Sequence, residues 1–215
     1  MKSCIVVGMG RFGSEVARQL QKQGCEVVAM DISSDLIQQI AEDVTHAVVG
    51  DAQDKAVLTA LGVSSMDYAV VAIGDNLSAS VLVTMNLKEL GVKYVVCKAH
   101  DHTHRRVLEK LGADQVVIPE YDQASRLAKS LAHVNVLDYI ELSAEYGIVD
   151  VPAPAIWDGK NLKELNVRAE LGINILAIRR QGQIHVSPGA SFAICKGDIV
   201  VMLGDERALK KVQKL

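Results

Sequence analysis

The sequence predicts an α/β protein: a doubly wound parallel sheet, then a helical crossover and a small α+β C-terminal lobe. Two observations support this fold class. Six short runs rich in Val and Ile recur along the first 120 residues, with enough chain between them for a helix each. Hydrophobic residues make up 49% of the 215 residues but aromatic ones only 4%, which is typical of a buried parallel sheet covered by helices.

The six predicted strands alternate with amphipathic stretches such as SEVARQLQKQG. In order they are CIVVGMG (4–10), EVVAMDI (26–32), HAVVGDA (46–52), YAVVAIGD (68–75), YVVCKAH (94–100) and QVVIPE (115–120). A glycine just past a helix end can take the left-handed conformation that caps the helix. The glycines expected in this role are Gly24, Gly62, Gly91 and Gly112. Right-handed crossovers then predict the strand order 3-2-1-4-5-6.

The pattern changes after Glu120. Residues 121–143 predict one long helix, a break near Asn135 and a short apolar element, and we interpret them as a crossover and dimerisation segment. The lobe, 144–215, has strand-like runs, a hairpin turning near Gln181-Gly182, and a helix or two helical turns over 159–172. Its expected core face comprises Ile175, Ile178 and Val201.

Composition argues against several classes of protein. A net charge of −3 gives no support to nucleic-acid binding, which needs a concentrated basic face. No apolar run approaches the length of a membrane span, and nothing resembles a signal peptide. The four cysteines have no CxxC spacing, and we expect them to be reduced, mostly in the core. A soluble, intracellular protein is the expectation.

The first strand leads into a GxGxxG motif, Gly8 to Gly13, at the start of an amphipathic helix. Gly8 permits the tight turn, Gly10 lets the backbone approach a phosphate, and Gly13 lets the helix pack on the strand. Asp31 follows 18 residues after Gly13, at the end of the second strand, where an acid can bind ribose hydroxyls. This Rossmann-like context predicts an adenine-nucleotide site, whereas the motif alone could be only a glycine turn.

Further candidates lie at the carboxyl ends of the neighbouring strands, where this fold binds ligands. Asp51 could contact the ligand, cap the following helix, or do both. The residues expected to bind the nucleotide are Gly8, Met9, Gly10, Arg11, Phe12, Gly13, Asp31, Ile32, Ser33, Asp51, Ala52, Ala72, Ile73, Gly74 and Lys98.

Arg11 is unusual because a cation at a helix N-terminus is unfavourable. Two interpretations are open. The arginine could pair with a surface acid, which contributes little to stability. Alternatively, its guanidinium could bind phosphate oxygens, and a bound polyphosphate would then make the position favourable.

The sequence offers no evident catalytic group. Tyr94 and Lys98 imitate a Y-x-x-x-K dehydrogenase pair, but in a strand residues four apart stand about 13 Å from each other. His100, His102 and His104 alternate, yet the stretch crosses from a strand end into a helix, so we expect the three side chains to diverge rather than bind a metal. A nucleotide pocket without an evident reaction indicates a sensor.

VVGMGRFGSEVA, HAVVGDA, VVAIGDNLSASVLVTMNLKELG, VCKAHDHTHRRVLEKLGADQVVIPE and NVLDYIELS together resemble the Ktr/Trk family of potassium-uptake regulators, in particular KtrA-type subunits with an RCK (KTN) domain. LNVRAELGINILAIRRQG and the later VSPGASFAICKGDIVVMLG resemble the RCK C-terminal lobe. The resemblance spans essentially the whole chain. It implies a non-enzymatic, cytoplasmic subunit at the inner face of the membrane, assembled from dimers into an octameric ring on a potassium-transporting membrane protein.

The same resemblance implies ligands. Family members bind ATP or ADP, and some NAD or NADH, at the glycine loop, and the nucleotide changes the shape of the ring. Arg11 would then reach the γ-phosphate, and Glu120 would help to hold a divalent cation such as Mg²⁺ or Ca²⁺, unless Glu120 is only a solvated residue at a helix start. An NAD-dependent oxidoreductase, or a sensor for another partner, is the alternative function.

The C-terminal lobe of some relatives binds cyclic di-AMP at a dimer interface. Asn166 stands where several relatives have an acid, and Trp157 is unusual, so a dimerisation lobe without a ligand is equally open. The positions implied for cyclic di-AMP are Leu162, Asn166, Arg168, Ala169, Ile175 and Pro188.

Overall fold

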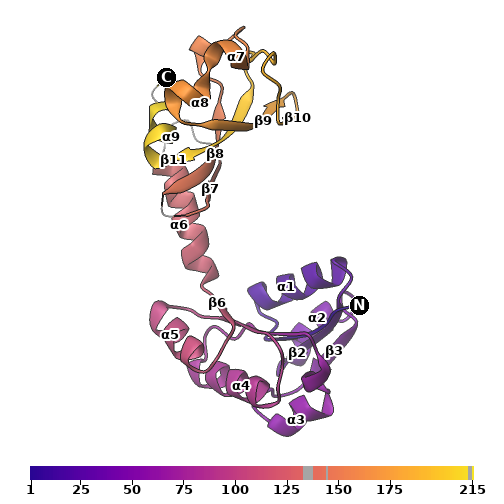
Figure 1. Ribbon diagram of the computed structural model, residues 1–215. Helices are drawn as coiled ribbons and strands as arrows, with labels where there is room; N and C mark the ends of the chain where they lie inside the picture. The colour runs from indigo at the N-terminus through magenta and orange to yellow at the C-terminus, as the bar shows by residue number, and fades with distance from the viewer. Residues whose placement is uncertain (133–137, 144, 213–214) are drawn as a thin grey trace. The chain divides into compact units, whose positions relative to one another are not determined.

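The computed structural model describes residues 1–132, 138–143, 145–212 and 215. The chain divides into two compact units, Met1–Asp122 and Gln123–Leu215, and each is described by itself. Figure 1 labels most of the helices and strands.

The first unit contains a six-stranded parallel sheet in the order β3-β2-β1-β4-β5-β6, which confirms the predicted order. The order reverses direction at β1, so β1 and β4 flank the crevice where this architecture binds ligands. The strands are β1 (Ser3–Val7), β2 (Glu26–Asp31), β3 (His46–Val49), β4 (Tyr68–Val71), β5 (Val95–Lys98) and β6 (Gln115–Val117).

Helices cover both faces of this sheet. Residues of α1 and α2 pack on one face, and residues of α3, α4 and α5 pack on the other. Both faces of the sheet need a cover because β1 is apolar on both sides. Ile5 and Val7 enter the core beneath α3–α5, whereas Cys4 and Val6 enter the core beneath α1 and α2. The helices are α1 (Arg11–Lys22), α2 (Ser34–Ile40), α3 (Lys55–Ala60), α4 (Leu77–Glu89) and α5 (His102–Lys110), with a 3₁₀ turn η1 (Val63–Ser65).

The four glycines predicted after helices all have positive φ. The values are 82° at Gly24, 68° at Gly62, 81° at Gly91 and 89° at Gly112. Other residues adopt this conformation only at a cost, so these glycines fix where four helices end.

The second unit begins within α6 (Pro119–Ala132), which crosses the division between the units. β7 lies inside the segment expected to be a helical crossover, yet it pairs with β8 in the second sheet. Asn135, where a break was expected, lies outside the described residues. The strands are β7 (Asp138–Glu141), β8 (Tyr146–Pro152), β9 (Asn174–Arg180), β10 (Gln183–Val186) and β11 (Ile199–Asp205).

These strands form an antiparallel sheet in the order β10-β9-β11-β8-β7, so the expected α+β lobe is confirmed. The hairpin turns at Gln181 and Gly182, both with positive φ, as a two-residue loop requires. The expected helical region forms two short helices. The helical elements are η2 (Ala155–Trp157), α7 (Leu162–Leu165), α8 (Val167–Leu171) and α9 (Glu206–Val212).

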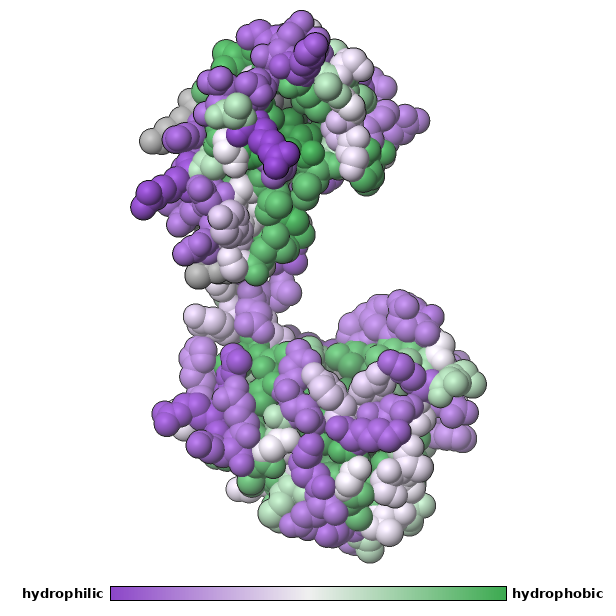
Figure 2. All heavy atoms as spheres, in the orientation of Figure 1, coloured by the Kyte–Doolittle hydropathy of each residue, from purple (hydrophilic) through white to green (hydrophobic). Residues whose placement is uncertain are grey.

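One predicted core residue of the lobe is wrong. Val200 and Met202 are fully buried, whereas Val201 is only half-buried, because successive residues of β11 face opposite sides of the sheet. Ile178 is fully buried as expected, and Ile175 packs against the same core. Figure 2 shows a hydrophobic band on the visible surface of the lobe, whereas hydrophobic and polar patches are interspersed on the visible surface of the first unit. None of the helices in the described part of the chain has the length and apolar character to span a bilayer.

Candidate functional site

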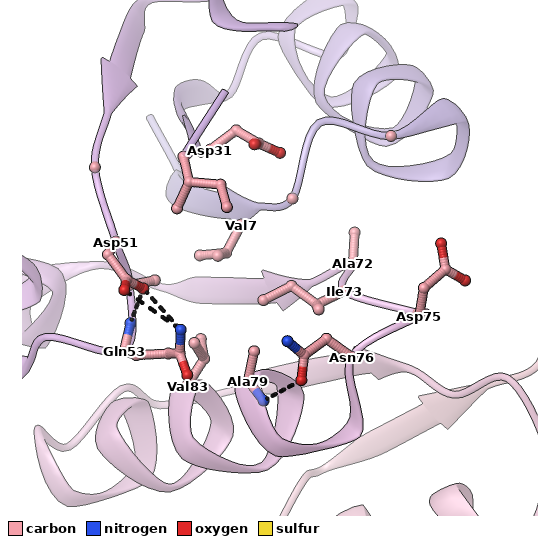
Figure 3. A pocket seen from close by; sticks show the side chains of 16 residues that line it. Val7, Asp31, Asp51, Gln53, Ala72, Ile73, Asp75, Asn76, Ala79 and Val83 are labelled. Carbon is pink, nitrogen blue, oxygen red and sulfur yellow. Dashed lines mark hydrogen bonds between the residues drawn. The ribbon is translucent and has the colours of Figure 1, made fainter. Parts of the chain in front are cut away.

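A pocket of about 280 Å³ opens where β1, β2, β3 and β4 end, at the reversal point of the sheet (Figure 3). Nine of the residues predicted to bind the nucleotide line it: Gly8, Gly10, Asp31, Ile32, Asp51, Ala52, Ala72, Ile73 and Gly74. The seven other residues in its lining are Val7, Gly50, Gln53, Asp75, Asn76, Ala79 and Val83.

Gly8 and Gly10 of the glycine loop line the pocket, and each glycine of the motif has a separate structural role. Gly8 has a φ of +96°, and its N–H donates to Met30 O at 2.8 Å, which holds the turn onto β2. A Cβ at Gly13 would lie 1.8 Å from Gly8 O, so no larger residue fits where α1 packs on the loop. A Cβ at Gly10 would meet nothing within 4 Å, so the backbone there is open to a ligand.

Asp31 joins the glycine loop to the loop after β2. Its Oδ2 accepts the Met9 N–H at 2.6 Å and its Oδ1 accepts the Ser33 N–H at 2.9 Å. Each oxygen keeps a second lone pair for a ligand hydroxyl. The neighbouring Ile32 is 73% exposed at the pocket, and Ser33 caps α2 through the Leu36 N–H.

Asp51 closes one side of the pocket together with Gln53 (Figure 3). Its carboxylate accepts the Gln53 N–H at 2.9 Å and the Gln53 side-chain amide at 3.2 Å. Of the two roles left open for Asp51, the helix cap belongs to another residue: Asp54 caps α3 by accepting the Ala56 N–H at 2.8 Å. Asp51 lies one turn too early, in the loop that leads to the helix.

Asp75 and Asn76 complete the opposite side of the pocket, and the sequence analysis missed both (Figure 3). Asn76 caps α4 by accepting the Ala79 N–H at 3.0 Å. A signal for Asp75 existed, because an aspartate stands at the end of β2 and shortly after the ends of β3 and β4. Gln53 was also missed, and its carbonyl accepts the Asn86 side-chain amide of α4 at 2.9 Å.

Six of the residues predicted to bind the nucleotide do not line the pocket: Met9, Arg11, Phe12, Gly13, Ser33 and Lys98. Met9 is buried beneath α1 and α2, and only its backbone reaches Asp31. Arg11 is exposed at the first position of α1. Lys98 is mostly buried, and its Nζ lies 5.9 Å from the centre of the Phe12 ring.

Lys98 and Glu120 form an ion pair beside the pocket. The Lys98 Nζ donates to Glu120 Oε1 at 2.8 Å, and it would lie 3.3 Å from a Cβ placed on Gly74, which lines the pocket. This hydrogen bond chiefly lowers the pKa of Glu120, and the charge of Arg11 lowers it further. The positive charges of Arg11, at the start of α1, and of Lys98 therefore both lie near Glu120, at the start of α6.

Glu120 alone does not make a metal site. Its carboxylate is 69% exposed and already binds an ammonium group. No cluster of three or more His, Cys, Asp or Glu side chains suited to a metal occurs among the described residues. The ligands that Mg²⁺ or Ca²⁺ prefers are therefore incomplete within the described part of one chain.

The expectation that the three alternating histidines diverge is wrong for His100 and His104, whose Nδ1 atoms lie 3.1 Å apart. The ring of His102 stacks edge-on against Tyr121, with centroids 4.8 Å apart, whereas His104 is buried and contacts His100. Tyr94 donates to Gln115, so the Tyr94–Lys98 pair has separate partners.

All four cysteines are free, as expected. Cys4 and Cys97 are buried, Cys25 is half-buried and Cys195 is exposed. Burial raises the pKa of both Cys4 and Cys97 to about 11, which keeps these thiols protonated.

The six positions suspected for cyclic di-AMP lie in α7, α8, the residue between these helices, β9 and the loop after β10. Leu162 and Ile175 pack against the core of the lobe, whereas Arg168 and Ala169 are exposed on α8. Asn166 links the two helices in a left-handed conformation with φ of 42°, and Pro188 is half-buried.

Comparison with known proteins agrees with this architecture. The TrkA-N domain family matches residues 4–119, and the TrkA-C domain family matches residues 147–215. Ktr system potassium uptake protein C of Bacillus subtilis is 43% identical over 213 residues, covering 99% of this chain and 96% of the relative. Ktr system potassium uptake protein A of the same organism is 41% identical, with 99% and 96% covered.

Solved structures share the fold. The GsuK RCK domain superposes with a TM-score of 0.67 at 18% identity, covering 100% of this chain and 47% of that chain. A C-terminal domain of Kef from Shewanella denitrificans, in AMP-bound form, has a TM-score of 0.53 at 30% identity, covering 61% and 82%. The family expected from the motifs is confirmed: the chain belongs to the TrkA family, with a TrkA-N and a TrkA-C domain, and is a homologue of the Ktr potassium-uptake proteins.

Proposed function

We propose that the pocket binds an adenine nucleotide, with the ribose at Asp31 and the phosphates at the start of α1. The observation that carries this proposal is the missing cap of α1. Side chains of Ser33, Asp54, Asn76 and Asp101 cap α2, α3, α4 and α5, whereas α1 follows Gly10 and has no side-chain cap. The first N–H groups of α1 are thus left for a phosphate, which a helix N-terminus favours.

The charges around the pocket support one orientation of the ligand. Asp31, Asp51 and Asp75 line the pocket and would repel a polyphosphate, but they can accept hydrogen bonds from ribose hydroxyls and the adenine amine. Arg11 and Lys98 lie on the side of α1, where the phosphates would be attracted. A γ-phosphate at Arg11 would explain why a cation is tolerated at a helix N-terminus.

ATP and ADP are the ligands we propose, with NAD or NADH as an alternative, since a GsuK channel structure is bound to NAD and the Kef domain to AMP. Asp31 could bind the ribose of either nucleotide. Mg²⁺ or Ca²⁺ at Glu120 would have to take its other ligands from phosphates or from a second copy of the chain.

We infer that the chain is a non-enzymatic regulatory subunit for a potassium-transporting membrane protein. It would act in the cytoplasm as a homo-oligomer, with dimers assembled into an octameric ring at the inner face of the membrane. A nucleotide can shift such an assembly between two shapes only if it binds one shape more tightly. Contact of Arg11 with a γ-phosphate that ADP lacks would supply that difference. Residues 121–143, as a crossover between subunits, would carry the change to the neighbouring copy.

The C-terminal lobe, 144–215, is the remaining part of this proposal. Cyclic di-AMP would bind near the exposed Arg168 and Ala169 at a contact between two lobes. A lobe that only dimerises is the alternative. Calorimetric titration with cyclic di-AMP distinguishes them, because an Arg168→Ala chain would lose binding that the wild type has.

The test of the nucleotide site is calorimetric titration of the full chain with ATP and ADP. We expect Arg11→Ala to narrow the gap between the two affinities and leave ADP binding nearly unchanged. The matched control is Arg18→Ala on the same helix, because Arg18 pairs with Asp43 at 2.7 Å. Unchanged discrimination in Arg11→Ala would overturn the γ-phosphate role, and light scattering with ATP checks the expected octamer.

A further inference from the structure

His104 is a buried titratable group that the pocket does not use. Its side chain lies in the first turn of α5, and the residue is only 1% exposed. Its Nε2 lies 3.1 Å from Ser80 Oγ of α4, and its Nδ1 lies 3.1 Å from Nδ1 of His100, in the loop after β5. His104 thus joins α5 to the loop just before it and to α4, where Ser80 lies 24 residues earlier in the sequence.

These contacts determine where the protons lie. The backbone N–H of His100 donates to His104 Nδ1 at 3.4 Å, so this nitrogen is an acceptor and carries no proton. The proton of His104 is then on Nε2 and is donated to Ser80. The single hydrogen between the two rings belongs to His100 Nδ1, which also donates to His104.

A further proton on His104 has no acceptor. An N–H at its Nδ1 would face the ring N–H of His100 at 3.1 Å and the backbone N–H of His100 at 3.4 Å. Like-charged imidazolium rings in this arrangement would repel, and three donors would meet with no lone pair between them. While the two rings stay in this contact, the His100–His104 pair can therefore hold at most one positive charge.

The surroundings of His104 oppose its protonation on balance. Burial lowers the pKa of His104, and the nearby His100 lowers it further, whereas Asp101 opposes the shift. Asp101 caps α5 by accepting the His104 N–H at 2.7 Å, and its Oδ2 lies 3.1 Å from His100 Nε2. On α4, His104 meets the neutral Ser80.

Neighbouring polar groups on α4 and β5 are also neutral. Thr84 donates to Ser80 O at 2.7 Å and lies 3.3 Å from Cys97 Sγ of β5. The Cys97 thiol stays protonated, because burial raises its pKa to about 11. No carboxylate of α4 or β5 is therefore available in these contacts to stabilise a charged His104.

Ser80 connects this network to the pocket. The preceding residue, Ala79, lines the pocket and donates its N–H to Asn76 Oδ1, and Asn76 lines the pocket as well. The bond between Ser80 and His104 thus holds the first turn of α4, whose residues form the pocket wall, against α5.

We propose that His100 and His104 form a proton-controlled clamp between α5 and the first turn of α4, which opens when the pair takes a second proton and thereby weakens ligand binding in the adjoining pocket. The effect on the ligand rests on the proposed nucleotide site. The clamp itself does not, because it is built from contacts within the first unit.

The sign of the pH effect follows from linkage. An unfolded chain protonates histidine near pH 6.5, whereas the folded chain resists protonation of His104 until a lower pH. Between these two values the unfolded state binds more protons, so acid destabilises the first unit. The contribution of neutral His104 is complete above about pH 6.5 and is lost as the pH falls toward the lowered pKa.

The first test compares unfolding by urea at pH 7.5 and pH 5.5, followed by far-UV circular dichroism. For wild type we expect the pH change to raise the unfolding constant of the first unit by up to about tenfold through His104. His104→Gln removes this titration and keeps an amide that can donate to Ser80. The change in its unfolding constant between the two pH values should therefore be smaller than that of the wild type by the same factor. The matched control, His102→Gln, loses only a contact with Tyr121 and should behave as the wild type.

A second measurement tests the clamp without the His104→Gln variant, in case that variant fails to fold. The ring Cε1–H resonance of His104, followed by NMR in the wild type, should titrate below pH 6.5. In His100→Gln, which leaves His104 in place, the midpoint should rise because one cause of the depression is gone. Titration of His104 at or above pH 6.5 in the wild type would overturn the clamp.

Coupling to the pocket is tested by calorimetric titration with ADP at the same two pH values. We expect acid to weaken ADP binding several-fold more in the wild type than in His104→Gln, since ionisation of the ADP phosphate is common to both. Equal loss in both proteins would overturn the coupling. If ADP binds neither protein at pH 7.5, the proposed nucleotide site fails, while the urea and NMR results still decide whether the clamp exists.

Discussion

Asp31, the last residue of β2, accepts the backbone N–H of Met9 at 2.6 Å and so ties the glycine loop to a second strand end 22 residues away. The loop is therefore held in place without any ligand. A ligand hydroxyl would meet a carboxylate that is already oriented, which lowers the entropy lost on binding.

We expect Asp31→Asn to weaken binding of ATP and ADP by at least about tenfold and to destabilise the first unit by roughly 1–2 kcal/mol. An amide offers only one acceptor oxygen, so either the Met9 or the Ser33 N–H would face an NH₂ group. Calorimetric titration and urea unfolding measure the two effects. The control is Asp35→Asn, an exposed residue in the first turn of α2, which should leave nucleotide affinity unchanged.

Gly13 and Gly10 should separate folding from binding. Gly13→Ala would place a Cβ 1.8 Å from Gly8 O, and we expect it to lower the free energy of unfolding by about 3 kcal/mol or more. Gly10→Ala meets nothing within 4 Å, so it should fold normally but obstruct the approach of a phosphate to α1. Thermal unfolding and ADP titration of both variants check this. A stable Gly13→Ala would contradict the packing argument.

Asp198 is the buried partner of an ion pair with Arg180 in the C-terminal lobe. It is 1% exposed, and its carboxylate accepts from Arg180 Nε at 2.8 Å and Nη2 at 2.7 Å. We expect Asp198→Ala to destabilise the lobe by roughly 2–4 kcal/mol, because Arg180 and the Cys195 N–H lose their acceptor. Fluorescence of Trp157, the single tryptophan, follows this lobe because the residue is buried in its core.

Two checks accompany the Asp198 prediction. Lys210→Ala breaks an exposed ion pair with Glu206 and should cost less than about 0.5 kcal/mol. The hydrogen bond from Arg180 lowers the pKa of Asp198, so its contribution is complete above about pH 3.9 and is lost as the pH falls further. The Trp157 transition of the wild type should therefore shift more between pH 5 and pH 3 than that of Asp198→Ala.

The cysteines should react in the order of their exposure. We expect 5,5′-dithiobis(2-nitrobenzoate) at pH 8 to modify Cys195 first and Cys25 more slowly in the native chain. Cys4 and Cys97 should react only after unfolding, because both are buried and the pKa of each is raised to about 11. Cys195→Ser should remove the fast phase. A fast phase that survives in this variant would contradict the assignment.

The strand order and four helix ends could be predicted because their signals are local. Short continuous apolar runs, and glycines such as Gly62 and Gly112 that must adopt positive φ, depend on residues only a few positions apart. Local reasoning was less reliable for single side chains. It placed Val201 on the wrong face of β11, and it left open whether Asp51 caps α3, a role that belongs to Asp54.

The sequence by itself determined the family, the sheet of the first unit and the strand ends at which a ligand would lie. Only the tertiary structure decided which side chains meet there: that Asp75 and Asn76 join Asp51 at the pocket, and that His104 reaches Ser80, 24 residues away. The reason is that backbone conformation follows from local sequence. A side chain's partner depends instead on how helices and strands from distant segments pack together.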